Sequence, residues 1–165
     1  MKISSLHDLY VQELRDLYHA ENQLIKALPK MVRAAGAAEL RSALEEHLQA
    51  TRQQVERLER IFQKLDESPK GAKCKGMEGI IGEGEQKMDG DAPERVRDAA
   101  LISSVQRVEH YEIAAYGTVR TYAQQLGYGD HAELLQQTLN EEGQADRKLT
   151  QIAESRVNME ANRTA

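Results

Sequence analysis

The sequence contains one cysteine, Cys74, among its 165 residues, one phenylalanine and no tryptophan. A single cysteine excludes an intrachain disulfide and a metal site built from several thiolates. Aromatic residues make up only 4% of the chain, which disfavours a β-sandwich or barrel, because such folds draw on aromatic and β-branched residues. The chain is instead rich in Ala, Leu, Glu, Gln and Arg, so the composition favours helices.

Other absences concern charge and long apolar runs. The formal net charge is −5, which argues against a nucleic-acid binder that neutralises phosphates with a basic face. No run of about 18 apolar residues is present, so we expect no membrane span. The first residues carry no apolar core of a signal peptide, and a lone cysteine suits a reducing compartment. We therefore expect a cytoplasmic protein that binds neither nucleic acid nor membrane.

Four long amphipathic segments are predicted, separated by glycine and proline. We expect helices over about residues 6–35, 37–66, 93–126 and 131–156, and a crossover over 67–92 that contains a short helix. Gly36 and Gly127 mark tight joins, so the helices on either side of each should form an antiparallel hairpin. Two hairpins joined by one long crossover predict an all-α, ferritin-like four-helix bundle that forms a single domain over residues 1–165.

Polar residues interrupt the apolar seam in the middle of each predicted helix, where side chains three and four positions apart face a bundle core. The interrupting residues are Glu21, His47, Thr51, Gln54, Glu109, Glu112, Glu142 and Asp146. Burying five carboxylates is costly without compensating positive charge, and no lysine or arginine occupies these positions. Two metal ions, iron or manganese, would supply that charge, as in di-iron and di-manganese bundles.

Counting from the hairpin joins tests whether these groups lie at one level. Glu109 and Glu112 are 18 and 15 residues before Gly127, and Glu142 and Asp146 are 15 and 19 residues after it. Glu21 is 15 residues before Gly36, whereas His47 is only 11 residues after it, about one turn nearer the join. Thr51 has the right depth but is a poor ligand. We predict the following metal ligands, with His47 the least well placed: Glu21, His47, Glu109, Glu112, Glu142 and Asp146.

A reading without metal is also open. A glutamate in such a position can face solvent or pair with a cation on a neighbouring helix, and a polar layer can fix helix register at a cost in stability. The candidate cations are Arg15, Arg52, Arg107 and Lys148.

Other polar residues receive simpler interpretations. Tyr18 lies near the first seam and could bond a ligand carboxylate, although packing in the core is the simpler expectation. Cys74 is flanked by two lysines, which would lower the pKa of its thiol, and we expect it in a solvated loop. His7, His19 and His131 show no partner spacing, so we expect them at the surface.

Several segments of the chain resemble the YciE/YciF family of ferritin-like proteins, and the resemblance covers nearly the whole sequence. These segments are Glu13–Leu24, His47-Leu48 with Thr51 and Gln54–Arg57, Lys73–Gly79, Arg97–Ile102, Val108–Ala114, and Thr138-Leu139 with Glu141-Glu142 and Asp146. The resemblance implies a ferritin-like bundle, a di-metal site, a homodimer and an intracellular role in stress. It implies no particular reaction.

The sequence also departs from the expected pattern. The ferritin superfamily supplies a Glu-x-x-His motif from each of two helices, and this motif is absent from the second and fourth seams. Glu112, three residues after Glu109, and Asp146, four residues after Glu142, would have to take over. Where the closer family often has acidic residues after His47-Leu48, this chain has Gln49 and Ala50.

Two classes of function therefore stand side by side. The first is a di-iron or di-manganese protein that handles oxygen, peroxide or ferrous iron, by ferroxidase, peroxidase or catalase-like turnover. The second is a non-enzymatic stress protein in which a structural metal or polar layer supports a dimer surface or a partner site. Iron storage in a cage is less expected, because no assembly element beyond the four helices is visible.

Overall fold

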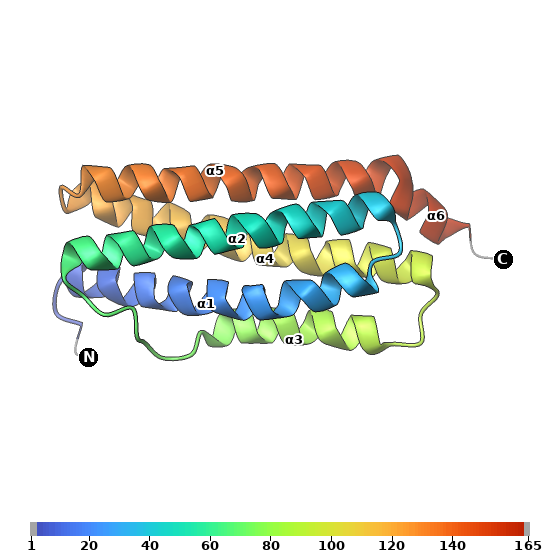
Figure 1. Cartoon of the computed structure of the whole chain (residues 1–165), viewed down its shortest axis with the longest axis horizontal. Coiled ribbons are helices and arrows are strands. Elements are labelled where there is room, and N and C mark those ends of the chain that lie inside the picture. The colour runs from blue at the N-terminus through green and yellow to red at the C-terminus, as the bar shows by residue number, and fades with distance from the viewer. Residues whose placement is uncertain (1–2, 164–165) are drawn as a thin grey trace.

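The computed structural model describes residues 3–163, and this part of the chain forms helices and no strands. The elements are α1 (Leu6–Ala34), α2 (Ala38–Leu65), α3 (Lys75–Asp89), α4 (Glu94–Gln125), α5 (Gly129–Ile152), a π-helical turn (Ala153–Val157) and α6 (Asn158–Asn162). The long helices α1, α2, α4 and α5 lie side by side as two hairpins, and the crossover between them carries α3 (Figure 1). The predicted all-α bundle is confirmed.

The turns of the two hairpins lie at opposite ends of the bundle (Figure 1). At one end, the amides of Gly36 and Ala37 donate hydrogen bonds of 2.8 Å each to the two carboxylate oxygens of buried Asp98. At the other end, Gly127 adopts a φ of 79°, which glycine reaches without the steric cost of a Cβ atom. The contact with Asp98 places the beginning of α4 beside the beginning of α2, and these two helices run in the same direction.

The C-terminal segment differs from expectation. We expected the last helix to end near residue 156, but helical structure continues through the π-helical turn to Asn162. Val157 is buried in the apolar cluster around Leu101 and Ile102, so its packing against α4 stabilises this extra turn. Within residues 3–163, no helix is long and apolar enough to cross a membrane.

The core consists of two apolar clusters with a polar layer between them. One cluster surrounds Leu24, Leu44 and Val105, towards the Asp98 end, and the other surrounds Leu14 and Val119, towards the opposite end. The buried polar residues that separate them are Glu21, His47, Thr51, Gln54, Glu109, Glu112 and Glu142. The seam pattern thus identified the buried layer correctly for every interrupting residue except Asp146, which is only partly buried.

Candidate metal centre

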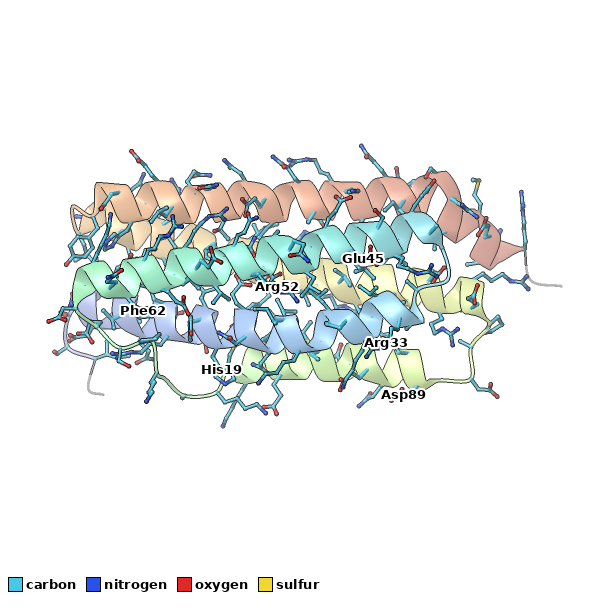
Figure 2. All side chains as sticks on the ribbon, viewed as in Figure 1. His19, Arg33, Glu45, Arg52, Phe62 and Asp89 are labelled. Carbon is cyan, nitrogen blue, oxygen red and sulfur yellow. The ribbon has the colours of Figure 1, made fainter. Side chains whose placement is uncertain are left out.

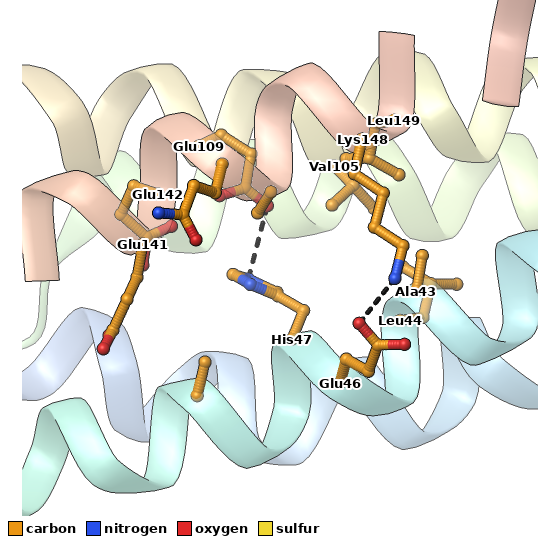
Figure 3. Close-up of a pocket in the computed structure, with 13 residues that line it drawn as sticks. Ala43, Leu44, Glu46, His47, Val105, Glu109, Glu141, Glu142, Lys148 and Leu149 are labelled. Atoms are coloured by element: carbon orange, nitrogen blue, oxygen red, sulfur yellow. Dashed lines mark hydrogen bonds and ion pairs between the residues drawn. The ribbon is translucent and has the colours of Figure 1, made fainter. Parts of the chain in front are cut away.

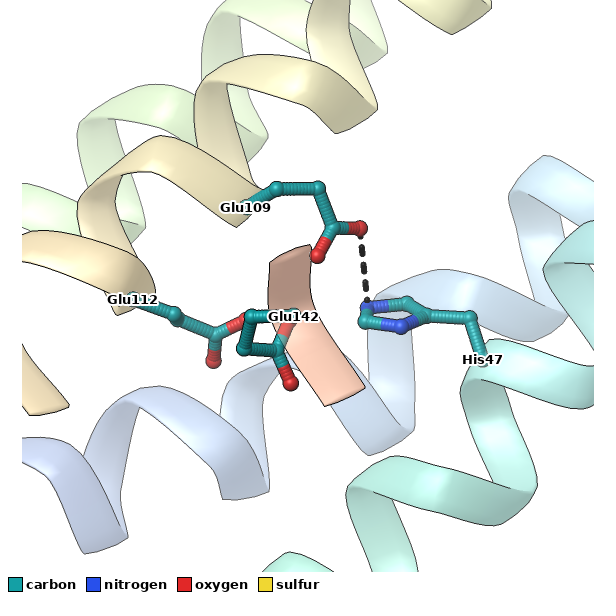
Figure 4. A group of neighbouring side chains, drawn as sticks. All are labelled: His47, Glu109, Glu112 and Glu142. Carbon is teal, nitrogen blue, oxygen red and sulfur yellow. Dashed lines mark ion pairs between the residues drawn. The ribbon is translucent and has the colours of Figure 1, made fainter. Parts of the chain in front are cut away.

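Four of the predicted ligands meet in the middle of the bundle. His47 of α2, Glu109 and Glu112 of α4 and Glu142 of α5 each offer one nitrogen or oxygen atom, and these atoms lie within 4.8 Å of one another (Figure 4). The three glutamates are 0% exposed and His47 is 6% exposed. The Nε2 atom of His47 is 3.4 Å from Oε1 of Glu109. The buried group could hold a metal ion.

The parallel course of α2 and α4 explains why His47 belongs to this group. The depth of His47 was counted from Gly36 and the depth of Glu109 from Gly127, and these two glycines lie at opposite ends of the bundle. Measured from the contact between Asp98 and Gly36, both His47 and Glu109 lie eleven residues further along helices that run the same way. At 1.5 Å per residue they reach the same level, so the estimate that His47 is one turn too shallow was wrong.

Glu21 is fully buried but does not join the group of four. Its Oε1 atom accepts a hydrogen bond of 2.5 Å from the hydroxyl of Tyr116 on α4. Glu21 lies fifteen residues before Gly36 and Glu112 lies fourteen residues after Asp98, so these two carboxyls share a level one turn beyond His47. Sequence analysis did not identify this role of Tyr116, although its position four residues after Glu112 places it on the same face of α4.

Asp146 also lies outside the group of four. Its side chain is 21% exposed, accepts a hydrogen bond of 3.1 Å from Nε2 of Gln106, and lies 3.5 Å from Nδ1 of the exposed His110. Asp146 follows Glu142 by one full turn and a further rotation of about 40°, which directs it to another part of α4. Its assignment as a ligand stays a prediction that this geometry does not support.

Most carboxyl oxygens of the four glutamates in the layer have no hydrogen-bond donor. Both oxygens of Glu109 and Glu112 and one oxygen each of Glu21 and Glu142 are buried without a partner. Loss of solvation therefore raises the pKa of Glu21, Glu109 and Glu112 well above the ordinary range, and neighbouring carboxyls raise it further. Burial lowers the pKa of His47. Without a cation, these groups favour protonated carboxyls beside a neutral imidazole.

The cations that could have neutralised this layer bind elsewhere. Arg107 pairs with Glu83, Lys148 with Glu46, and Arg15 with Glu67. Arg52 lies exposed on the outer face of α2 (Figure 2). The alternative without metal expected these four residues to pair with the buried carboxylates, and their observed ion pairs are with other residues.

A neighbouring network that the sequence did not reveal links α2 to α5. Arg57 forms two 2.6 Å hydrogen bonds to Glu141, the residue before Glu142. Gln54 donates to Oε1 of Glu142 and, at 3.2 Å, to Oε2 of Glu141, while its own amide oxygen has no partner. Gln54 thus holds one oxygen of Glu142 and leaves the other free, and Arg57 neutralises Glu141. Thr51 is not available as a donor to the carboxyls, because its hydroxyl bonds to the backbone oxygen of His47 at 2.9 Å.

Tyr18 packs against the apolar core, as expected: its ring contacts Phe62, and its hydroxyl donates to Glu59 at 3.0 Å rather than to a ligand carboxylate. The expectation for Cys74 was wrong. Cys74 is buried at the beginning of α3, with its sulfur 3.1 Å from Oδ2 of Asp16 and 3.1 Å from the Tyr111 hydroxyl. Burial raises the pKa of this thiol, the opposite of the effect expected from the flanking lysines.

The histidines expected at the surface also have partners. His131 is buried and stacks on Tyr10, whose hydroxyl lies 3.3 Å from its Nδ1 atom. His7 lies 3.2 Å from the Tyr128 hydroxyl, and His19 is bonded to Gln23. The contacts of His131 and His7 each join residues 121 positions apart, so no local spacing predicts them, whereas His19 and Gln23 are one helical turn apart.

Comparison with known proteins adds a family to this geometry. A family model described as a domain of unknown function, DUF892, matches residues 5–162. Protein YciF of Escherichia coli (strain K12) is 42% identical over 166 residues, which cover all of both chains. The crystal structure of this E. coli stress protein matches with a TM-score of 0.91 and 43% identity, over 94% of this chain and 99% of that one.

Two other solved structures share the fold. YcfI from Rhodopseudomonas palustris matches with a TM-score of 0.88 and 42% identity, over 90% of this chain and 95% of that one. A protein from Xanthomonas campestris pv. campestris matches with a TM-score of 0.75 over 96% of this chain and 98% of that one, but at 21% identity it shows the fold alone.

Proposed function

The chain belongs to the DUF892 family and is a relative of the E. coli stress protein YciF, and from this premise we propose that it is a stress-associated carboxylate metal protein. It would bind two ions of iron or manganese and act on oxygen, peroxide or ferrous iron. The observation that carries the proposal is the convergence of three fully buried glutamates and a histidine whose free oxygen and nitrogen atoms have no hydrogen-bond partner.

The chemistry of these side chains suits such an ion. Carboxylate oxygens and imidazole nitrogen are ligands that iron and manganese accept, and thiolates, which favour zinc or iron–sulfur clusters, are absent from the group. A bound iron or manganese ion would supply redox chemistry toward oxygen or peroxide. The first ion would be held by His47, Glu109, Glu112 and Glu142. Glu21, which lies at the level of Glu112, would be a ligand of the second ion.

The remaining residues of the layer would position these ligands. On binding a cation, Glu109 and Glu112 would release their protons, since the positive charge replaces the solvation that burial removed. Tyr116 keeps its proton and donates a hydrogen bond to Oε1 of Glu21, which leaves Oε2 of Glu21 without a partner. Gln54 fixes one oxygen of Glu142 in the same way.

Metal analysis tests the proposal directly. Protein purified without chelators, and again after exposure to Fe(II) or Mn(II), should contain about one to two equivalents of metal. The Glu109→Gln variant should lose most of it, whereas Glu45→Gln, an exposed glutamate on α2, should not. Failure of the wild-type protein to retain or take up metal would contradict the proposal.

A second candidate function rests on the contacts from α2 to α5. Arg57 bonds to Glu141 and Gln54 bonds to Glu142, and these contacts could fix the register of α2 and α5 in a non-enzymatic stress protein. Cells carrying the double variant Glu109→Gln, Glu142→Gln separate the two. Stress resistance that survives these changes favours the register role, and its loss together with the metal favours the metal protein.

The proposal also includes a homodimer in the cytoplasm, as the family resemblance implies. Among the described residues, the only exposed large hydrophobic side chains are Ile3 and Met159, so a dimer face would be mainly polar. Light scattering of the purified protein tests this part independently of metal.

A further inference from the structure

A pocket of about 220 Å³ lies between α2 and α5 and has α4 as its floor (Figure 3). Its inner wall contains His47, Glu109 and Glu142, which are three of the four residues of the candidate metal centre. The pocket therefore connects the surface of the bundle with a polar layer that is otherwise buried between two apolar clusters.

Small and apolar residues form the sides of this pocket. Ala43 and Ala50 of α2 face Ala145 of α5, and Leu44, Val105 and Leu149 complete the apolar part. Larger side chains at the three alanines would fill the gap between the two helices. This apolar part offers a hydrated cation no replacement for its lost water, whereas dioxygen has almost no solvation to lose and uncharged hydrogen peroxide loses far less than an ion.

The mouth of the pocket carries balanced charge. Glu46 of α2 and Lys148 of α5 form a 2.5 Å ion pair across it, and their side chains are 62% and 44% exposed (Figure 3). Glu141, which also lines the pocket, is neutralised by Arg57. Because these charges are paired, the mouth carries no excess of one sign, and an exposed ion pair is weak enough to open.

We propose that a small uncharged ligand of the size of dioxygen or hydrogen peroxide binds in this pocket, here called the α2–α5 pocket. From the pocket the ligand reaches the buried wall formed by His47, Glu109 and Glu142. The role of the ligand rests on the proposed metal centre, whereas the shape of the pocket does not depend on a metal. The ion pair between Glu46 and Lys148 spans the mouth of the pocket. Rotation of these two side chains opens the mouth.

Xenon is the probe for the metal-free protein, because it is uncharged and binds in apolar cavities. Crystals pressurised with xenon should show density in the α2–α5 pocket next to Ala145 and Ala50. The variants Ala145→Leu and Ala50→Leu should each lose this density, and Ala114→Leu, at an exposed alanine of α4, should keep it. Absence of xenon from the wild-type pocket, or its persistence in both filled variants, would overturn the proposal.

Metal uptake and gas binding separate this proposal from the metal centre itself. Ala145→Leu should take up as much Fe(II) as wild type, while nitric oxide binding to the ferrous-loaded variant, followed by stopped-flow absorbance, should be severalfold slower. A variant that blocks Fe(II) uptake without slowing nitric oxide would make the pocket a route for cations and refute the inference. If no protein takes up metal, the proposed function fails, and the xenon experiment still decides whether the pocket binds an uncharged ligand.

Discussion

The buried carboxyls should make the metal-free protein less stable as the pH rises. Burial raises the pKa of Glu21, Glu109 and Glu112, so the folded protein retains protons there that the unfolded chain has already released. The stability these groups contribute is present below the unfolded pKa of about 4.3 and is lost as the pH rises toward the folded pKa. Each retained proton lowers the free energy of unfolding by about 1.4 kcal/mol per pH unit in that window.

Replacing Glu112 with glutamine isolates one of these protons. Both oxygens of Glu112 are buried without a partner, and glutamine keeps the shape while removing the titration. The pH dependence of the metal-free Glu112→Gln variant should therefore be shallower by up to about 1.4 kcal/mol per pH unit above pH 5. Glu45→Gln, on the exposed face of α2, is the matched control and should keep the wild-type slope.

Urea unfolding of the chelated proteins, followed by circular dichroism from pH 5 to pH 8, measures this slope. Saturating Mn(II) should raise the stability of wild type most at the upper end of the range, because the ion displaces the retained protons. An identical slope for Glu112→Gln and wild type would refute the reasoning, as would metal-free stability that increases with pH. Either result would mean that the protein stabilises the ionised carboxylate by itself.

Two further predictions concern groups outside the centre. Asp98→Ala should lower the free energy of unfolding by about 2 kcal/mol in urea melts, because the buried amides of Gly36 and Ala37 lose their acceptor; an unchanged midpoint would contradict this. Burial lowers the pKa of His131, so its stabilising effect is present above the unfolded pKa of about 6.5 and is lost as the pH falls below it. His131→Phe should therefore flatten the loss of melting temperature on acidification, and an unchanged loss would contradict this.

The sequence predicted the fold well because its signals are local and repeated. Gly36 and Gly127 mark the two hairpins. Apolar seams run along helices as long as α1, with 29 residues, and α4, with 32, and such long amphipathic helices leave few alternatives to a bundle. The end of the last helix was misjudged, because Val157 is held by distant residues of α4 that no local pattern reveals.

The candidate centre was predictable in composition but not in detail. Burial of polar residues in a seam depends on helical periodicity alone, so Glu21, Glu109, Glu112 and Glu142 were identified as a buried layer. The level of His47 depends on how the hairpins are aligned, and that alignment is set by Asp98 across 61 and 62 residues of sequence. Asp146 lies one turn further along α5, where its carboxylate accepts a hydrogen bond from Gln106 and stands outside the group of four.

We propose that the buried acidic layer holds cations. Anomalous diffraction from crystals grown with Fe(II) or Mn(II), recorded at the iron and manganese absorption edges, tests it most directly. We predict anomalous density within bonding distance of His47, Glu109, Glu112 and Glu142. Metal density only at surface carboxylates, or an ordered layer joined by proton-sharing carboxyls with no anomalous signal, would contradict the account.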